Sequence, residues 1–212
     1  MSPARPLRVV LADDHDLVRA GVRALLSCME GIAVVAEASD GTSLPALLER
    51  VEADVLVTDV SMPGADGLAT LPAVRARHPA LRVLVLTMFD SPEFVRRAAA
   101  GGAHGYLTKD AAPHELEAAL RRVATGGRHF GGEAARALRQ PGAPVPSEAL
   151  TGRQLEILVR IAHGQSAKEI GFDLGLSPKT VDAHRARIME RLQVADIAGL
   201  TRYALRQGLV QA

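Results

Sequence analysis

The 212-residue sequence contains one cysteine, no tryptophan and only six other aromatic residues, four Phe and two Tyr. Cys28 therefore has no partner for an internal disulfide, and its place in an apolar helical pattern predicts a small buried side chain. With so few aromatic rings, stacking of unpaired bases on aromatic side chains is excluded as a main way of binding single-stranded nucleic acid.

Long apolar runs are also missing. No stretch approaches the roughly 18 consecutive apolar residues that a membrane span requires. The first ten residues, MSPARPLRVV, lack the apolar core of a signal peptide. We therefore expect a cytoplasmic protein with no membrane partner.

Neither sign of charge dominates the chain, whose formal net charge is +1. Residues 1–125 contain 13 Lys and Arg against 16 Asp and Glu, whereas residues 126–212 contain 12 against 8. An acidic and a basic segment in one chain indicate two domains with different tasks, and the length is sufficient for two small domains.

Five short runs rich in Val and Leu alternate with longer segments whose apolar residues recur every three or four positions. Continuous apolar runs of this length are typical of parallel strands that are buried on both faces. Their alternation with helices predicts a doubly wound α/β domain with a five-stranded parallel sheet in residues 1–125. The predicted strands cover residues 7–12, 32–38, 54–59, 81–87 and 104–109.

The composition changes after residue 125. Five Gly and three Pro lie between residues 126 and 146. This composition is typical of a linker, so we predict a linker over residues 126–147 that contains a short helix at Glu133–Leu138.

Residues 148–212 show only helical patterns. Thr151 is placed to cap the first helix, Ser166 begins a capping box, and Ser177 caps a third helix with proline in its first position. Two helices joined by a short turn, with a fourth from about Asp196 behind them, predict an all-α four-helix domain containing a helix-turn-helix.

Polar side chains end four of the five predicted strands: Asp13 and Asp14 the first, Asp59 the third, Thr87 the fourth and Lys109 the fifth. Because the carboxyl ends of parallel strands meet at one edge of a sheet, we expect these side chains to converge. Mg²⁺ prefers one or two carboxylates together with water and a phosphate. No other nucleophile stands at these strand ends, so Asp59 is the candidate acceptor of a phosphoryl group.

Two sets of motifs resemble known families. Residues 7–125 resemble a response-regulator receiver domain, which has a flavodoxin-like fold, through DD after the first strand, DVSMPGADG from Asp59, LT before Met88 and GYLTKD from Gly105. Residues 149–208 resemble the LuxR-type helix-turn-helix through LTGRQLEIL and GQSAKEIGFDLGLSPKTVDAHRARIMERL. Domains in this order resemble the NarL/FixJ class of response regulators in two-component systems.

The resemblance implies that Asp59 accepts a phosphoryl group from the phosphohistidine of a sensor histidine kinase. Mg²⁺ would be the cofactor, held by Asp14, Asp59 and the backbone carbonyl of Ser61, and Asp13 would act mainly through a metal-bound water. The protein would not be an enzyme with a separate substrate. Its own chemistry would be limited to Mg²⁺-dependent self-phosphorylation and autodephosphorylation at Asp59.

The same resemblance assigns roles to three residues around the acceptor. Lys109 would pair with the phosphoryl oxygens, and Thr87 would move to hydrogen-bond them. Tyr106 would then rotate inward and change the surface around the fourth and fifth strands, so that a local charge alters a face of the domain.

The helix after Ser177 is the expected DNA-reading element, with Val181, Ile188 and Leu192 forming its core stripe. Its candidate DNA contacts fall into three groups. We expect phosphate contacts from Lys179, Thr180 and Arg187, and base contacts from Asp182, Ala183 and Arg185, while His184 either approaches a phosphate or is packed or solvated.

One small helix-turn-helix offers few contacts, so a homodimer on two half-sites of double-stranded promoter DNA is expected when the protein is phosphorylated or DNA-bound. RNA polymerase is a further expected partner. Two other classes of function stay open. One is a Mg²⁺-dependent phosphotransferase or phosphatase with an aspartyl nucleophile, and the other is a protein-interaction module with an unphosphorylated receiver.

Overall fold

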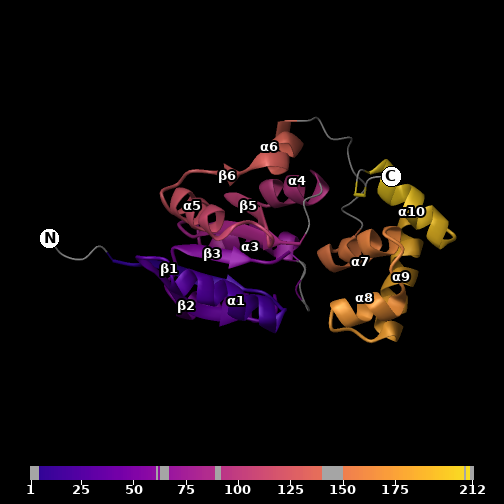
Figure 1. Cartoon of the computed structure of the whole chain (residues 1–212), viewed down its shortest axis with the longest axis horizontal. Coiled ribbons are helices and arrows are strands. Elements are labelled where there is room, and N and C mark those ends of the chain that lie inside the picture. The colour runs from indigo at the N-terminus through magenta and orange to yellow at the C-terminus, as the bar shows by residue number, and fades with distance from the viewer. Residues whose placement is uncertain are drawn as a thin grey trace.

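The computed structural model describes residues 5–60, 62, 67–88, 92–139, 150–207, 209 and 210. An α/β domain is followed by a helical domain (Figure 1). The α/β domain is built on a six-stranded sheet with the order β2-β1-β3-β4-β5-β6, in which every pairing is parallel. The strands are β1 Leu7–Ala12, β2 Ile32–Ala38, β3 Val55–Thr58, β4 Arg82–Thr87, β5 Gly105–Thr108 and β6 His129–Phe130.

Six helices of the described chain accompany this sheet. They are α1 Asp16–Ser27, α2 Leu44–Arg50, α3 Gly67–Arg77, α4 Pro92–Ala100, α5 Pro113–Ala124 and α6 Gly132–Arg139. None of the described helices combines the length and the apolar character needed to cross a membrane.

Alternation along β1 shows how the helices divide between the two faces of the sheet. Val9 and Leu11 join a buried cluster with apolar side chains of α1 and α5. Val10 and Ala12 join a second cluster with side chains of α2, α3 and α4. Since successive strand residues point to opposite faces, the helices cover both faces, and the predicted doubly wound fold is confirmed.

The prediction of a five-stranded sheet was wrong by one strand. β6 pairs with β5 through Gly105 and Tyr106, which face His129 and Phe130. Two half-buried residues in a Gly-rich segment are too few to produce an apolar run, so the sequence pattern does not reveal them. β6 and α6, which packs on α4, fall within the segment predicted as a linker, and the boundaries between the domains stay a prediction.

The prediction of a buried Cys28 was also wrong. Cys28 is exposed, because it forms the C-cap of the helix after the last apolar residue that faces the sheet, Leu26. Asp16 is the first residue of α1. His15 occupies the N-cap without a capping hydrogen bond from its side chain, and Asp16 pairs with Arg19.

The helical domain has the four helices that the sequence predicts. The side chains of Thr151, Ser166, Ser177 and Asp196 each accept a hydrogen bond from a backbone N–H in the first turn of the helix that follows. Val181 and Ile188 are buried, and Leu192 is partly buried. The helices are α7 Gly152–Ala162, α8 Ala167–Asp173, α9 Pro178–Leu192 and α10 Ile197–Arg206.

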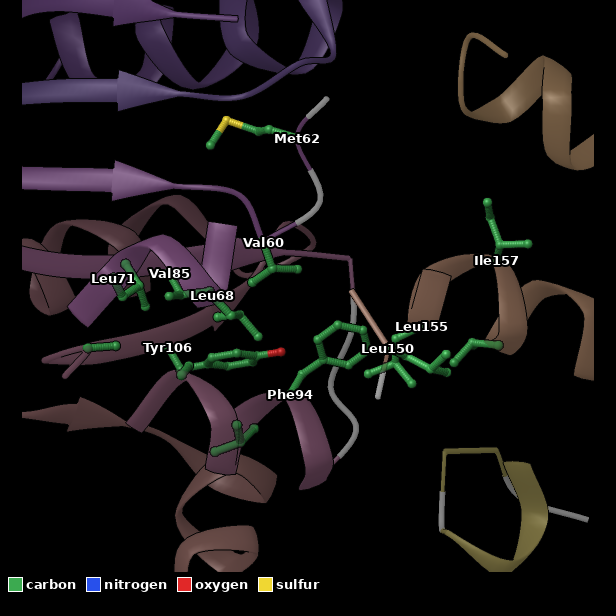
Figure 2. Packing of buried hydrophobic residues seen from close by; sticks show 14 of the residues in the cluster. Val60, Met62, Leu68, Leu71, Val85, Phe94, Tyr106, Leu150, Leu155 and Ile157 are labelled. Carbon is green, nitrogen blue, oxygen red and sulfur yellow. The ribbon is translucent and has the colours of Figure 1, made fainter. Parts of the chain in front are cut away.

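The two domains touch through α7, which lies beside the edge of the sheet where the strands end (Figure 1). Figure 2 shows Phe94 of α4 next to Leu150 and Leu155 of the helical domain, and these three side chains belong to one buried cluster. The guanidinium of Arg153 lies 3.8 Å from the carboxylate of Asp14 across the same boundary. The apolar core therefore continues from one domain into the other.

Candidate metal centre and nucleic-acid interface

The parallel ladders bring the predicted strand-end residues to one place. β1 and β3 are in register at Ala12 and Thr58, and the N–H of Asp59 donates to the carbonyl of Ala12 at 2.9 Å. The N–H of Lys109 donates to the carbonyl of Thr87 at 2.7 Å, which continues the ladder between β4 and β5. These backbone pairings bring the ends of the strands, and the residues that follow them, to one edge of the sheet.

Lys109 links the two strands that carry the acids. Its Nζ lies 2.7 Å from Oδ2 of Asp13 and 2.7 Å from Oδ2 of Asp59. All three side chains are nearly inaccessible, at 3–4% exposed. Burial leaves ion pairs poorly screened, so this ammonium is the counter-charge that two buried carboxylates need.

The pKa values of Asp13 and Asp59 shift in opposite directions, although both carboxylates pair with Lys109. Burial acts to raise the pKa of Asp13, but its hydrogen bonds with His15 and the charge of Lys109 outweigh burial and leave that pKa lowered. Burial raises the pKa of Asp59 despite the opposing charge of Lys109. Burial acts to lower the pKa of Lys109, but Asp59 and Asp13 outweigh it and leave that pKa raised.

His15 is a member of this cluster that the sequence reasoning missed. Its Nδ1 lies 3.0 Å from Oδ1 of Asp14 and 3.5 Å from Oδ1 of Asp13. Hydrogen bonding to Asp13 and then to Asp14 raises the pKa of His15 to about 10. The sequence signal for this contact was a histidine directly after Asp13 and Asp14. His15 is the N-cap of α1, and its side chain lies beside these two acids.

The cluster fits a divalent cation. Carboxylate oxygens of Asp13, Asp14 and Asp59 and a ring nitrogen of His15 all lie within 4.8 Å of one another. Oδ1 of Asp14 is buried, and Nδ1 of His15 lies 3.0 Å from it as its ion-pair partner. Three carboxylates form an oxygen-rich set of the kind that hard cations prefer. Ser61, the fourth predicted ligand, lies outside the described residues.

Thr87 and Tyr106 lie on neighbouring strands beside this cluster. The hydroxyl of Thr87 is buried and makes no hydrogen bond within the described part of the chain. Tyr106 is 2% exposed and lies near Phe94 (Figure 2). The tyrosine predicted to rotate inward is thus already inside, while the threonine hydroxyl lacks an acceptor. A buried hydroxyl without a hydrogen-bond partner costs free energy that a new acceptor nearby would recover.

The predicted DNA-reading residues lie on the open side of α9. Five of the seven are exposed, and the remaining two, His184 and Arg185, are partly buried. The guanidinium of Arg185 is 2.9 Å from the carboxylate of Asp182 on the same helix. The exposed five are Lys179, Thr180, Asp182, Ala183 and Arg187.

Two of these side chains have local roles as well. The N–H and hydroxyl of Thr180 both contact Oγ of Ser177, so Thr180 takes part in the cap of α9. Burial lowers the pKa of His184, and the charges of Arg153 and Arg187 lower it further. His184 is partly buried, and its contact with a DNA phosphate stays a prediction.

Comparisons with known proteins identify the families of both domains. The family described as "Response regulator receiver domain" matches residues 9–121, and "Bacterial regulatory proteins, luxR family" matches residues 148–204. The chain is 36% identical over 210 residues to response regulator GacA of Pseudomonas protegens, covering 97% of this chain and 99% of that protein. It is 36% identical over 211 residues to response regulator UvrY of Escherichia coli, covering 97% of each.

Solved structures give the same result for the fold. A structure of the Salmonella typhimurium RcsB response regulator, with 30% sequence identity, superposes with a TM-score of 0.62 over 93% of this chain and 98% of that one. A structure of two RcsB dimers bound to two parallel DNAs, also 30% identical, gives a TM-score of 0.61 over 93% and 97% of the two chains.

Proposed function

The chain belongs to the response regulators of two-component systems that join a receiver domain to a LuxR-type DNA-binding domain, and from this membership we propose that Asp59 is its phosphoryl acceptor. The protein regulates transcription through two-component signalling. The observation that carries the acceptor assignment is the contact of Asp59 with Lys109 at 2.7 Å, inside the one group of acidic side chains among the described residues that could hold a metal ion.

The acceptor chemistry requires one carboxylate oxygen of Asp59 to attack phosphorus and the donor's leaving group to depart. Asp13, Asp14 and Asp59 would hold Mg²⁺, which supplies positive charge to the phosphoryl oxygens when it is bound. Lys109, whose Nζ lies 2.7 Å from Oδ2 of Asp59, supplies a second positive charge. The self-phosphorylation and autodephosphorylation that the sequence predicts are part of this proposal, with the histidine kinase as the physiological donor.

Thr87 gives the acceptor site a connection to the rest of the receiver. Its buried hydroxyl has no partner among the described side chains and gains one when a phosphoryl oxygen arrives. The neighbouring Tyr106 is packed against α4, so a small movement of Thr87 changes the support of that helix. This movement is the proposed coupling between phosphorylation and the α4 surface.

The second half of the proposal concerns DNA. Lys179, Thr180 and Arg187 position α9 on phosphates, and Asp182, Ala183 and Arg185 read bases in the major groove. The RcsB structure with two dimers on DNA supports a dimer of this chain on two half-sites. A cytoplasmic location and contact with RNA polymerase are parts of the same proposal, since both follow from action at a promoter.

Incubation with acetyl phosphate and Mg²⁺, followed by intact-mass measurement, tests the acceptor. We expect one phosphoryl adduct on the wild-type chain and none on Asp59→Asn. Asp110→Asn is the matched control, because Asp110 is an exposed carboxylate next to Lys109, and it should still be phosphorylated. An adduct on Asp59→Asn, or no adduct on the wild type, would contradict the assignment.

A further inference from the structure

Four basic side chains gather at the edge of the sheet where the strands begin. Arg82 is the first residue of β4, His104 directly precedes β5, and Arg128 directly precedes β6. Arg75, in the last turn of α3, joins them, because its Nη1 donates to the carbonyl of Leu81 at 2.6 Å. Since all the strands are parallel, this basic cluster lies at the edge opposite to the acceptor site.

Backbone pairing sets the place of His104 at the centre of the basic cluster. Its N–H donates to the carbonyl of Val83 at 2.8 Å, and its carbonyl accepts from the N–H of His129 at 2.9 Å. Arg82 and Arg128 directly precede these two partners in the sequence. Both arginines are therefore neighbours of His104, one on each side along the sheet.

Two N–H donors face the imidazole of His104. The backbone N–H of Val83 donates to Nδ1 at 3.1 Å, and Nη1 of Arg82 lies 3.1 Å from Nε2. Burial, followed by the charges of the three arginines of the cluster, lowers the pKa of His104 to about 4. The ring is therefore neutral at neutral pH, and a neutral imidazole has one acceptor nitrogen and one N–H. It satisfies only one of its two donors.

The strand decides which donor the imidazole satisfies. The N–H of Val83 is held by the pairing of β4, whereas the long side chain of Arg82 turns more easily. Nδ1 of His104 therefore accepts from Val83, and Nε2 carries the proton. Nε2–H and the guanidinium of Arg82 are then two donors whose nitrogens lie 3.1 Å apart. Two donors this close are stabilised by an acceptor that both of them contact.

No acid of the described chain supplies that acceptor. Within the residues that the structure describes, none of the three arginines of the cluster forms an ion pair. Arg128 lies over the ring of Phe130, 5.1 Å from its centroid. Asp54, directly before the neighbouring β3, accepts from the N–H of Arg82 through its carbonyl, while its carboxylate pairs with Arg8 at 3.0 Å. The cluster thus carries three positive charges that no described carboxylate neutralises.

We propose that the basic cluster binds the diphosphate group of a small ligand, with one phosphate oxygen accepting from both Arg82 and Nε2 of His104. Guanidiniums pair well with phosphate oxygens, which have lone pairs for more than one donor. One phosphate group carries at most about two negative charges, so a second is needed to match three guanidiniums. Arg75, Arg82 and His104 are partly buried, which favours a small ligand over the wide backbone of a DNA duplex.

Calorimetric titration of the full chain with pyrophosphate tests this site. EDTA in the buffer removes metal ions that would carry pyrophosphate to the carboxylates of the acceptor site. Arg82→Gln removes one charged donor and should weaken binding about tenfold. Arg77→Gln is the matched control, because Arg77 lies on α3 with a side chain 65% exposed, and this variant should bind like the wild type. No binding to the wild type, or equal affinity of all three proteins, would overturn the proposal.

NMR spectra of the histidine ring nitrogens keep the proposal testable if Arg82→Gln disturbs the fold. With isotope-labelled histidine in the wild-type chain, His104 should give the signals of a neutral ring protonated on Nε2, and His104→Gln identifies these signals by their loss. Pyrophosphate should shift them. A ring protonated on Nδ1, or signals that pyrophosphate leaves in place, would contradict the shared acceptor.

Two further probes in the same spectra distinguish the sources of the phosphate. A shift of the His104 signals by adenosine diphosphate as well as by pyrophosphate would support a site for nucleotide diphosphates, and a shift by pyrophosphate alone would support a site for the free ion. A larger shift with a DNA duplex than with either small probe would overturn the assignment to a small ligand.

Discussion

The acceptor site and the recognition helix use the same kinds of side chain in opposite environments. In the receiver, the buried ammonium of Lys109 lies 2.7 Å from each of two buried carboxylates, those of Asp13 and Asp59. On α9, Asp182 and Arg185 also pair, at 2.9 Å, but with side chains 50% and 35% exposed. Buried charges are fixed in place for chemistry, whereas exposed charges stay available to a partner and contribute little to folding.

The strongest test of this comparison removes the buried lysine. Lys109→Ala takes away the counter-charge shared by two buried carboxylates, so one of them must bind a proton or a metal. We expect phosphorylation by acetyl phosphate to slow about 100-fold or more, the typical loss when one group that stabilises a developing charge is removed. Intact-mass time courses measure this rate.

The control for Lys109→Ala is the same substitution at an exposed lysine of the other domain. Lys168 is exposed on α8, and Lys168→Ala should leave the phosphorylation rate unchanged. If phosphorylation slows in both variants, or in neither, the rate does not depend on the position of Lys109 within the buried cluster.

On the exposed side of the comparison, Arg185→Ala should have the next largest effect. A well-placed arginine contact to a base contributes about 1–3 kcal/mol of discrimination. We expect promoter affinity to fall about tenfold and the base preference to relax at one position in each half-site. Binding measured on a set of single-base variants of the site gives both quantities. An affinity loss that is equal for all variants would reassign Arg185 to the phosphates.

Lys179→Ala should have a smaller and different effect. A phosphate contact gives no sequence information, so affinity should fall several-fold on every DNA alike. The slope of log affinity against log salt should become shallower by about 1. Affinities measured at several salt concentrations test this prediction, and an unchanged slope would exclude a phosphate contact by Lys179.

Most of the fold follows from local patterns that the sequence displays openly. The five longer strands coincide with apolar runs, and the caps Thr151, Ser166 and Ser177 mark three helices of the second domain. β6 was missed because two residues carry no periodicity. Cys28 was misjudged because the register of α1 decides burial, and a window of sequence does not show where the last turn of a helix ends.

The site was predictable where it depends on strand order, and not where it depends on packing between distant parts. Parallel strands bring Asp13, Asp59 and Lys109 together in any such fold. The contact of His15 with Asp14 depends on the residue at which α1 begins. The contact of Arg153 with Asp14 depends on how the two domains pack against each other. No local sequence pattern predicts the packing between the two domains. The apolar residues Leu155 and Val159 lie on the face of α7 opposite Ile157, as an apolar contact with the receiver requires.

The smallest expected effect completes the comparison. Asp182→Ala breaks the exposed pair with Arg185, and the free energy of unfolding of the helical domain should change by less than about 0.5 kcal/mol. Surface pairs contribute little because water and salt screen them and because two long side chains must be ordered to form them. Urea unfolding of the full chain, followed by circular dichroism, measures the change. A loss above about 2 kcal/mol would show that exposure does not separate the two kinds of charge, since breaking a buried pair typically costs about 3–5 kcal/mol.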